Sequence, residues 1–152
     1  MKKILFISTR NPYSGRFSGD VIGSLKIINV LKKKYTVDIV TLSKGKIKNK
    51  KNIISFHQPN FFLKILYVLL SLCKMRPLQF GLFQSKKMKE YIQRVAENYD
   101  LLFFYHFRSS QYLPKKYKGR TVIEMGDLYS HNYFQTFCNL DILNPVKYIY
   151  FV

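Results

Sequence analysis

The sequence has 152 residues and lacks several features that would assign a protein to a class at once. It contains no tryptophan, and its two cysteines, Cys73 and Cys138, have neither a metal-ligand spacing nor a CxxC arrangement. It also contains neither the GxGxxG dinucleotide fingerprint nor a GKS or GKT phosphate loop. The apolar start ends at Arg10, too early for a signal peptide. We therefore expect a cytoplasmic protein with reduced thiols and no metal site.

Acidic residues are scarce. The chain has 8 acidic and 26 basic residues, which give a formal net charge of +18. Such an excess favours an anionic partner, such as nucleic acid, an acidic membrane surface or a phosphorylated ligand. A coding bias towards lysine, isoleucine and asparagine explains the same excess, and the two interpretations stay open. No RRM, KH or helix-turn-helix signature is present, so a nucleic-acid partner is not expected.

The pattern of apolar residues changes repeatedly between a strand period and a helix period. Residues 3–9 form a continuous apolar run, typical of a strand buried on both faces, and a glycine loop and an amphipathic helix follow. Further strands are expected at 35–42, 53–56, 100–105 and 121–125, a helix at 84–98 and a helical turn at 111–116. This alternation predicts one α/β domain over 1–152, a three-layer Rossmann-like fold. We expect a parallel sheet in the strand order 3-2-1-4-5 with helices on both faces.

Residues 61–75 are the most apolar part of the chain, with Lys64 in their midst. About 15 residues fall short of the ~20 that a membrane-spanning helix needs. The segment is apolar nearly all round, whereas a sheet covers only one side of a helix. It is therefore either a buried core helix or a helix that contacts a membrane surface or a partner. We expect peripheral attachment to an anionic membrane through this segment and nearby lysines.

Three loops follow the carboxyl ends of predicted strands, where open parallel sheets bind their ligands. They cover residues 10–19, 106–110 and 126–131. The glycines of the first loop either let backbone N–H groups approach a phosphate or simply turn the chain. Asp20 is expected to cap the helix that follows this loop. The candidate ligand-binding residues in these loops are Gly15, Gly19, His106, Ser109, Asp127 and Ser130.

Several segments together resemble the N-terminal domain of family 4 glycosyltransferases, one half of the GT-B architecture. They are the start Met1-Lys2-Lys3-Ile4-Leu5-Phe6-Ile7-Ser8, the loop Asn11-Pro12-Tyr13-Ser14-Gly15 with Gly19-Asp20, the run Tyr99-Asp100-Leu101-Leu102-Phe103, and Val122-Ile123-Glu124-Met125-Gly126-Asp127-Leu128-Tyr129-Ser130. The subgroup often has Gly-Gly-Asp at the first helix, where this chain has Ser18-Gly19-Asp20.

The resemblance implies roles for particular residues. The N-terminal half of such enzymes binds the acceptor, and its first glycine loop touches the donor diphosphate. Gly15, Gly19 and Asp20 would then lie on the phosphate side. Many members carry a histidine where the fifth strand ends, and this chain has Gly126 there. Asp127 is therefore the candidate that activates or holds the acceptor hydroxyl.

The resemblance also implies a function. The chain would be the acceptor-binding half of a glycosyltransferase that moves a sugar from a nucleotide-sugar to a lipid-linked or envelope glycan acceptor. Against the resembled architecture, we expect that this sequence lacks the domain that binds the donor and that its first domain is incomplete at the C-terminus. We therefore expect a fragment, a frameshifted product or half of a split enzyme, inactive without a donor-domain chain and using no cofactor. The alternatives are a non-catalytic, membrane-associated binding module and, less favoured, a nucleic-acid binder.

Overall fold

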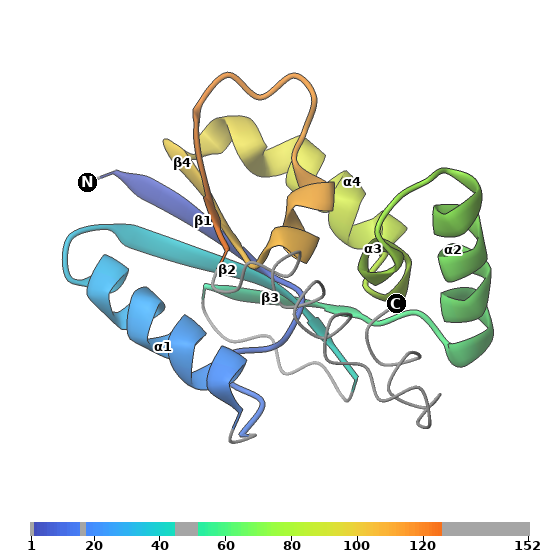
Figure 1. Cartoon of the computed structure of the whole chain (residues 1–152). Coiled ribbons are helices and arrows are strands. Elements are labelled where there is room, and N and C mark those ends of the chain that lie inside the picture. Colours follow the sequence, from blue (N-terminus) through green and yellow to red (C-terminus); the bar gives the residue numbers. More distant parts are fainter. Residues whose placement is uncertain (1, 16–17, 45–51, 126–152) are drawn as a thin grey trace, which may run out of the picture.

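The computed structural model describes residues 2–15, 18–44 and 52–125, which form a three-layer α/β fold (Figure 1). Its centre is a five-stranded sheet in the order β3-β2-β1-β4-β5, and every neighbouring pair is parallel. The predicted fold class and strand order are confirmed. The strands are β1 (Lys3–Ser8), β2 (Thr36–Ser43), β3 (Ile53–His57), β4 (Leu101–Tyr105) and β5 (Arg120–Glu124). The helices are α1 (Gly19–Lys32), α2 (Phe61–Cys73), α3 (Leu78–Leu82), α4 (Lys86–Val95), and the 3₁₀ helices η1 (Ala96–Asn98) and η2 (Phe107–Tyr112).

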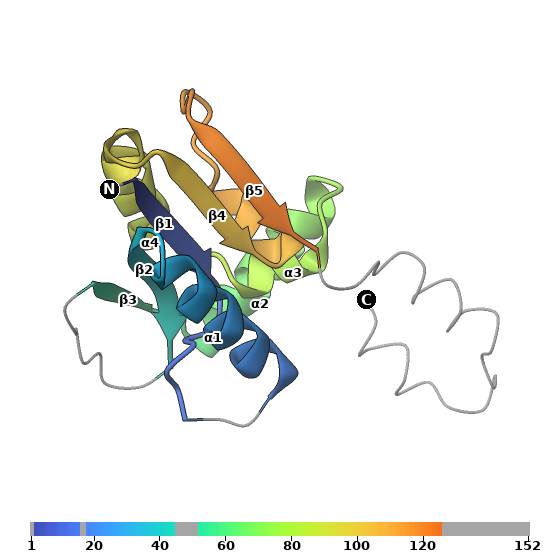
Figure 2. The same ribbon diagram turned by 90° about the vertical axis from the view of Figure 1, so that its left-hand side faces the viewer.

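The two faces of the sheet bury two separate apolar cores, because successive side chains of a strand point to opposite faces. Phe6 of β1 clusters with Ile28 of α1 on one face. Leu5 of β1 clusters with Met88 and Ile92 of α4 on the other. All five of these side chains are fully buried. Figure 2 shows α1 on one side of the strands and α4 on the opposite side.

The start of α1 differs from the expectation. The N-cap residue is Ser18, with extended backbone and no side-chain capping hydrogen bond, and Asp20 lies within the first turn. The prediction that Asp20 caps the helix is therefore wrong. Its carboxylate instead accepts hydrogen bonds from Arg10 and Arg108. Two charged donors compete well with neutral backbone N–H groups for one carboxylate.

Helix α2 lies apart from both cores and packs mainly against α3, as Figure 1 shows. Ser71 is its only buried residue, so the interpretation of this segment as a core helix is wrong. Among the described residues, no helix is long and apolar enough to cross a membrane.

The helical turn expected at 111–116 occurs earlier, as η2 directly after β4. His106 between them has a positive φ of 67°, which reverses the chain at the end of the strand. The backbone N–H of Ser109 then donates to the carbonyl of His106 over 3.0 Å. The loop after β4 is therefore short and tightly folded against the carboxyl end of the sheet.

Candidate functional site

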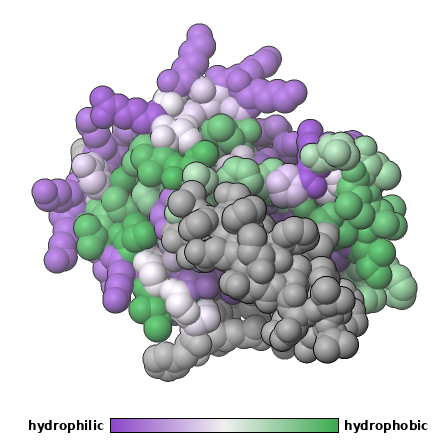
Figure 3. All heavy atoms as spheres, in the orientation of Figure 1, coloured by the Kyte–Doolittle hydropathy of each residue, from purple (hydrophilic) through white to green (hydrophobic). Residues whose placement is uncertain are grey.

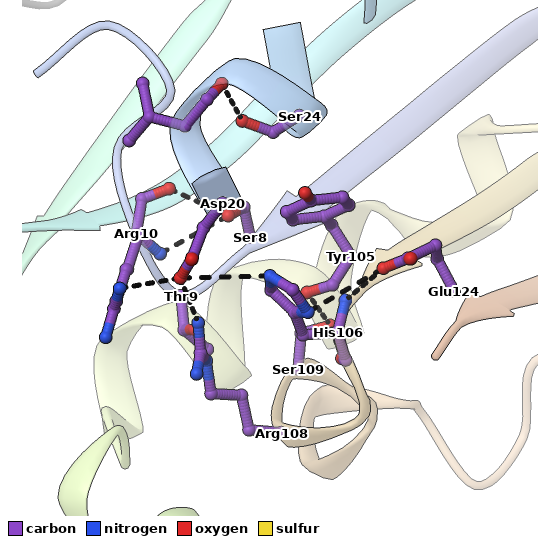
Figure 4. A network of polar contacts seen from close by, with 11 residues as sticks. Ser8, Thr9, Arg10, Asp20, Ser24, Tyr105, His106, Arg108, Ser109 and Glu124 are labelled. Atoms are coloured by element: carbon purple, nitrogen blue, oxygen red, sulfur yellow. Dashed lines mark hydrogen bonds and ion pairs between the residues drawn. The ribbon is translucent and has the colours of Figure 1, made fainter. Parts of the chain in front are cut away.

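A group of polar side chains meets at the carboxyl ends of β1, β4 and β5 (Figure 4). We call it the polar cluster. Because β1 and β4 are neighbours in the parallel sheet, the segments that follow them lie side by side. Open parallel sheets bind ligands at this edge. The polar cluster consists of Thr9, Arg10, Asp20, His106, Arg108 and Glu124.

Asp20 connects the loops at the ends of β1 and β4. Its Oδ2 atom lies 2.6 Å from a guanidinium nitrogen of Arg10 and 3.1 Å from one of Arg108. Burial raises the pKa of this carboxyl, but the charge of Arg10 and the hydrogen bond and charge of Arg108 outweigh burial. The net result is a pKa below its usual value of 3.8. Asp20 is therefore a carboxylate at neutral pH, available to accept hydrogen bonds.

Arg108 is the best-anchored member of the cluster, with a side chain only 8% exposed. Its Nε atom donates to Thr9 Oγ1 over 2.7 Å, and its guanidinium carbon lies 4.9 Å from the centre of the Phe83 ring. A buried guanidinium needs partners of this kind to offset its desolvation. Sequence reasoning omitted Arg108 from the candidates. The available signal was its place in the loop after the fourth strand, beside His106.

His106 lies partly buried between two carboxylates. Its Nε2 atom lies 3.9 Å from Asp20 and its Nδ1 atom 3.7 Å from Glu124. Neither ring nitrogen has a hydrogen-bond partner among the described residues, and the side chain is only 12% exposed. The backbone N–H of His106 donates to Glu124 over 3.4 Å.

The protonation state of His106 follows from these surroundings. Burial and the positive charge of Arg108 lower the pKa of His106 below its usual 6.5, although the charges of Asp20 and Glu124 act in the opposite direction. The imidazole is therefore neutral at pH 7 and able to take up a proton. A positive φ and unpaired buried nitrogens both cost free energy, and such costs concentrate at functional sites.

The other predicted site residues are placed differently. The hydroxyl of Ser109 is fully buried, 2.7 Å from the carbonyl oxygen of His106 and 2.9 Å from that of Tyr105, to either of which it can donate. It therefore stabilises the turn into η2. Gly15 is exposed with a φ of 72°, a conformation that favours glycine, and Gly19 begins α1. Asp127 and Ser130 lie outside the described residues.

The cluster brings together two guanidinium groups, two carboxylates and a neutral imidazole. The opposite formal charges of these groups balance. Within the described ranges, no group of three or more histidine, cysteine, aspartate or glutamate side chains could hold a metal ion. The guanidinium, carboxylate and imidazole groups of the cluster can take part in hydrogen bonding and proton transfer.

Comparisons with known proteins assign no function to the chain, so the geometry of the polar cluster is the main guide to function. Neither the family models nor the curated proteins gave a match to the chain.

Proposed function

We propose that this chain is the acceptor-binding half of a glycosyltransferase. It would present a lipid-linked or envelope glycan acceptor to a sugar carried by a nucleotide. The observation that carries the proposal is the polar cluster at the carboxyl edge of β1 and β4, in a parallel sheet of order β3-β2-β1-β4-β5. Such an edge is where open α/β sheets bind ligands. The sequence resemblance to family 4 glycosyltransferases supports the same function.

The chemistry of the cluster suits an acceptor sugar. Asp20 can accept hydrogen bonds from sugar hydroxyls, while Arg10 and Arg108 can donate to sugar oxygens. Attack of an acceptor hydroxyl on the anomeric carbon forms a new C–O bond, releases the nucleoside diphosphate and requires the hydroxyl proton to leave. A neutral imidazole such as His106 can receive that proton. Asp127, outside the described residues, stays a second candidate for this role.

The donor requires a second binding surface. Glycosyl transfer needs the anomeric carbon held against the acceptor hydroxyl, and in the resembled architecture two facing domains share this task. The described residues form one sheet, and only its carboxyl edge is proposed as a binding surface. Gly15 and Gly19 are the candidates for contact with the diphosphate. We therefore expect the isolated 152-residue chain to be inactive and a donor-domain chain to be its partner.

Transfer assays test this function directly. The purified chain is incubated with UDP- and GDP-sugars and lipid-linked acceptors, first alone and then with a chain that carries a donor-binding domain. We expect transfer only in the second case. His106→Gln and Asp20→Asn should each reduce transfer, whereas Glu90→Gln on the exposed side of α4 should not. Transfer by the isolated chain, or equal transfer by all variants, would contradict the proposal.

A non-catalytic, membrane-associated binding module is the second candidate, and the exposed apolar side chains of α2 favour it. Such a module would bind vesicles yet support no transfer with any donor-domain chain. For either function we propose a cytoplasmic location, where the exposed free thiol of Cys73 would stay reduced. The less favoured nucleic-acid binder would show salt-sensitive retention on nucleic acid.

A further inference from the structure

Helix α2 exposes most of its apolar side chains to solvent. Phe61 is 72% exposed, Phe62 83%, and Met75 just beyond the helix 94%. In Figure 3 this region is a continuous apolar area over α2 and its ends. We call it the α2 apolar surface. It consists of Phe61, Phe62, Leu63, Ile65, Leu66, Leu69, Leu70, Leu72 and Met75.

The exposure is one-sided. The less exposed residues of α2 are Lys64, Tyr67, Val68 and Ser71, which recur at the spacing of one helix face. This face packs on α3, where the backbone of Tyr67 and Val68 comes so close to Gly81 that a Cβ atom there would lie 2.6 Å from a carbonyl oxygen. The contact between α2 and α3 therefore fixes the orientation of the helix. The larger apolar arc points away from the domain.

The charges around this surface have one sign. From His57 to Ser85 the chain has no acidic residue, while Lys64, Lys74 and Arg76 are basic. Lys74 and Arg76 are exposed directly after the helix, beside Met75. An exposed apolar surface with two exposed cations at its C-terminal end is complementary to a lipid surface with anionic headgroups.

We propose that α2 docks on an anionic membrane surface, with its axis along the membrane plane and its apolar arc between the headgroups and the upper acyl chains. A helix of 13 residues is too short to span a bilayer, but its exposed apolar arc could insert among the headgroups while the helix lies in the membrane plane. Apolar insertion and attraction to anionic lipid are the two signals that stable attachment requires. The inference does not depend on the proposed function.

Helix α2 is connected to the polar cluster through the elements between them. Helix α3 contacts η2 through the Phe80 and Phe107 rings, whose centres lie 5.3 Å apart. The carbonyl of Phe83 accepts a hydrogen bond from the Tyr112 hydroxyl, and the Phe83 ring lies against Arg108. Helix α2 is thus linked to the polar cluster indirectly, through α3, Phe83 and η2.

Co-sedimentation of the full chain with vesicles tests the proposal. We expect binding to vesicles of phosphatidylcholine with phosphatidylglycerol, weak binding to pure phosphatidylcholine, and loss of binding as salt rises. Phe62→Glu with Leu66→Glu should weaken the apparent affinity about tenfold or more, because two inserting side chains are lost. Lys74→Gln with Arg76→Gln should weaken it several-fold. Val30→Glu, which replaces an exposed apolar residue of α1, is the matched control and should bind normally.

The absence of tryptophan supplies an independent measurement. Phe62→Trp introduces a single fluorophore, whose emission should shift to the blue and be quenched by lipids with brominated acyl chains. Val30→Trp should show neither effect. Equal behaviour of the two tryptophan variants, or equal vesicle binding by the two glutamate variants, would overturn the proposal. Concentration-dependent dimerisation that Phe62→Glu abolishes, without vesicle binding, would instead identify a second copy as the occupant and overturn it too.

Discussion

The hydroxyl oxygen of Tyr105 lies 2.5 Å from the position that a Cβ atom at Gly23 would occupy. Tyr105 ends β4, is only 5% exposed and stacks on Phe6, so its ring has little freedom to move. Gly23 lies within α1, where glycine costs about 1 kcal/mol relative to alanine. The tyrosine hydroxyl occupies the space that a larger side chain would need, which explains why the helix has a glycine at this position despite that cost.

Gly23→Ala should therefore destabilise the fold by about 1 kcal/mol, because the tyrosine must shift and its loss of packing exceeds the gain in helix propensity. In a Tyr105→Phe background the obstructing oxygen is gone, and the same substitution should be neutral or stabilising. Urea denaturation of the four proteins in this double-mutant cycle measures the difference. Equal effects of Gly23→Ala in both backgrounds would show that the contact carries no free energy.

The two arginines that bind Asp20 should differ in their contribution to stability. Arg108→Lys removes the donor to Thr9 and the planar contact with Phe83, so we expect a loss of about 2 kcal/mol. Arg10 has a side chain 47% exposed, so Arg10→Ala should cost less than about 1 kcal/mol. Urea midpoints of both variants test this order, and the reverse order would contradict the assigned burial.

His106 should make stability fall as the pH drops below about 6.5. Its folded-state pKa is lowered, so the unfolded chain takes up a proton first, and protonation favours unfolding until the folded pKa is passed. His106→Asn keeps a residue that tolerates a positive φ and should lack this part of the pH dependence. Unfolding free energies between pH 8 and pH 5 measure it. If His106 instead stabilised the fold more strongly as the pH fell, Asp20 and Glu124 would be stabilising the imidazolium.

Asp20 should contribute stability at neutral pH that is lost in acid. Its folded pKa lies below 3.8, so the stabilisation is fully present above that value and disappears as the pH falls through the folded pKa. Asp20→Asn should therefore be less stable than the natural chain at pH 7, and the difference should shrink in acid. Chemical denaturation of the pair at pH 7 and pH 3 tests the sign.

Gly81→Ala should loosen α2 without unfolding the sheet. Its Cβ atom would meet the carbonyl oxygen of Tyr67 at 2.6 Å and the Cα atom of Val68 at 2.7 Å, and backbone atoms cannot rotate away. Hydrogen exchange should accelerate in α2 while β1 keeps its protection. Gly19→Ala, where a Cβ atom would meet nothing within 4 Å, is the control and should leave α2 unchanged.

The sheet could be predicted from the sequence because its strands appear there as runs of apolar residues. In β1, the five residues from Ile4 to Ser8 are all buried, so no side chain interrupts the pattern. The orientation of α2 could not be predicted in the same way. Nearly every residue of that helix is apolar, so periodicity cannot say which face packs. The close approach of Gly81 in α3 to the backbone of Tyr67 and Val68 determines which face of α2 packs.

The polar cluster was only partly predictable. Position after a strand was sufficient to select His106, because parallel strands bring their carboxyl ends to one edge, whereas Asp20 was selected through the resemblance. It was not sufficient to pair Asp20 with Arg108, which lies 88 positions away and is held by Thr9. The expected cap at Asp20 failed for the same reason. The capping rule considers only backbone N–H groups near Asp20 in the sequence. In the folded chain, the carboxylate accepts hydrogen bonds from two arginine side chains instead.

The exposed helix has a topological origin. In a parallel sheet every connection leaves a strand at the carboxyl edge and returns to the amino edge before the next one. Helix α4 covers one face of the sheet on the way to β4, and α2 and α3 precede it in the same connection. Because only three residues separate the end of β3 from the start of α2, this helix must begin near the carboxyl edge of the sheet. Sequence changes in α2 and α3 can therefore alter which molecules contact the carboxyl edge of the sheet, while the strand order stays the same.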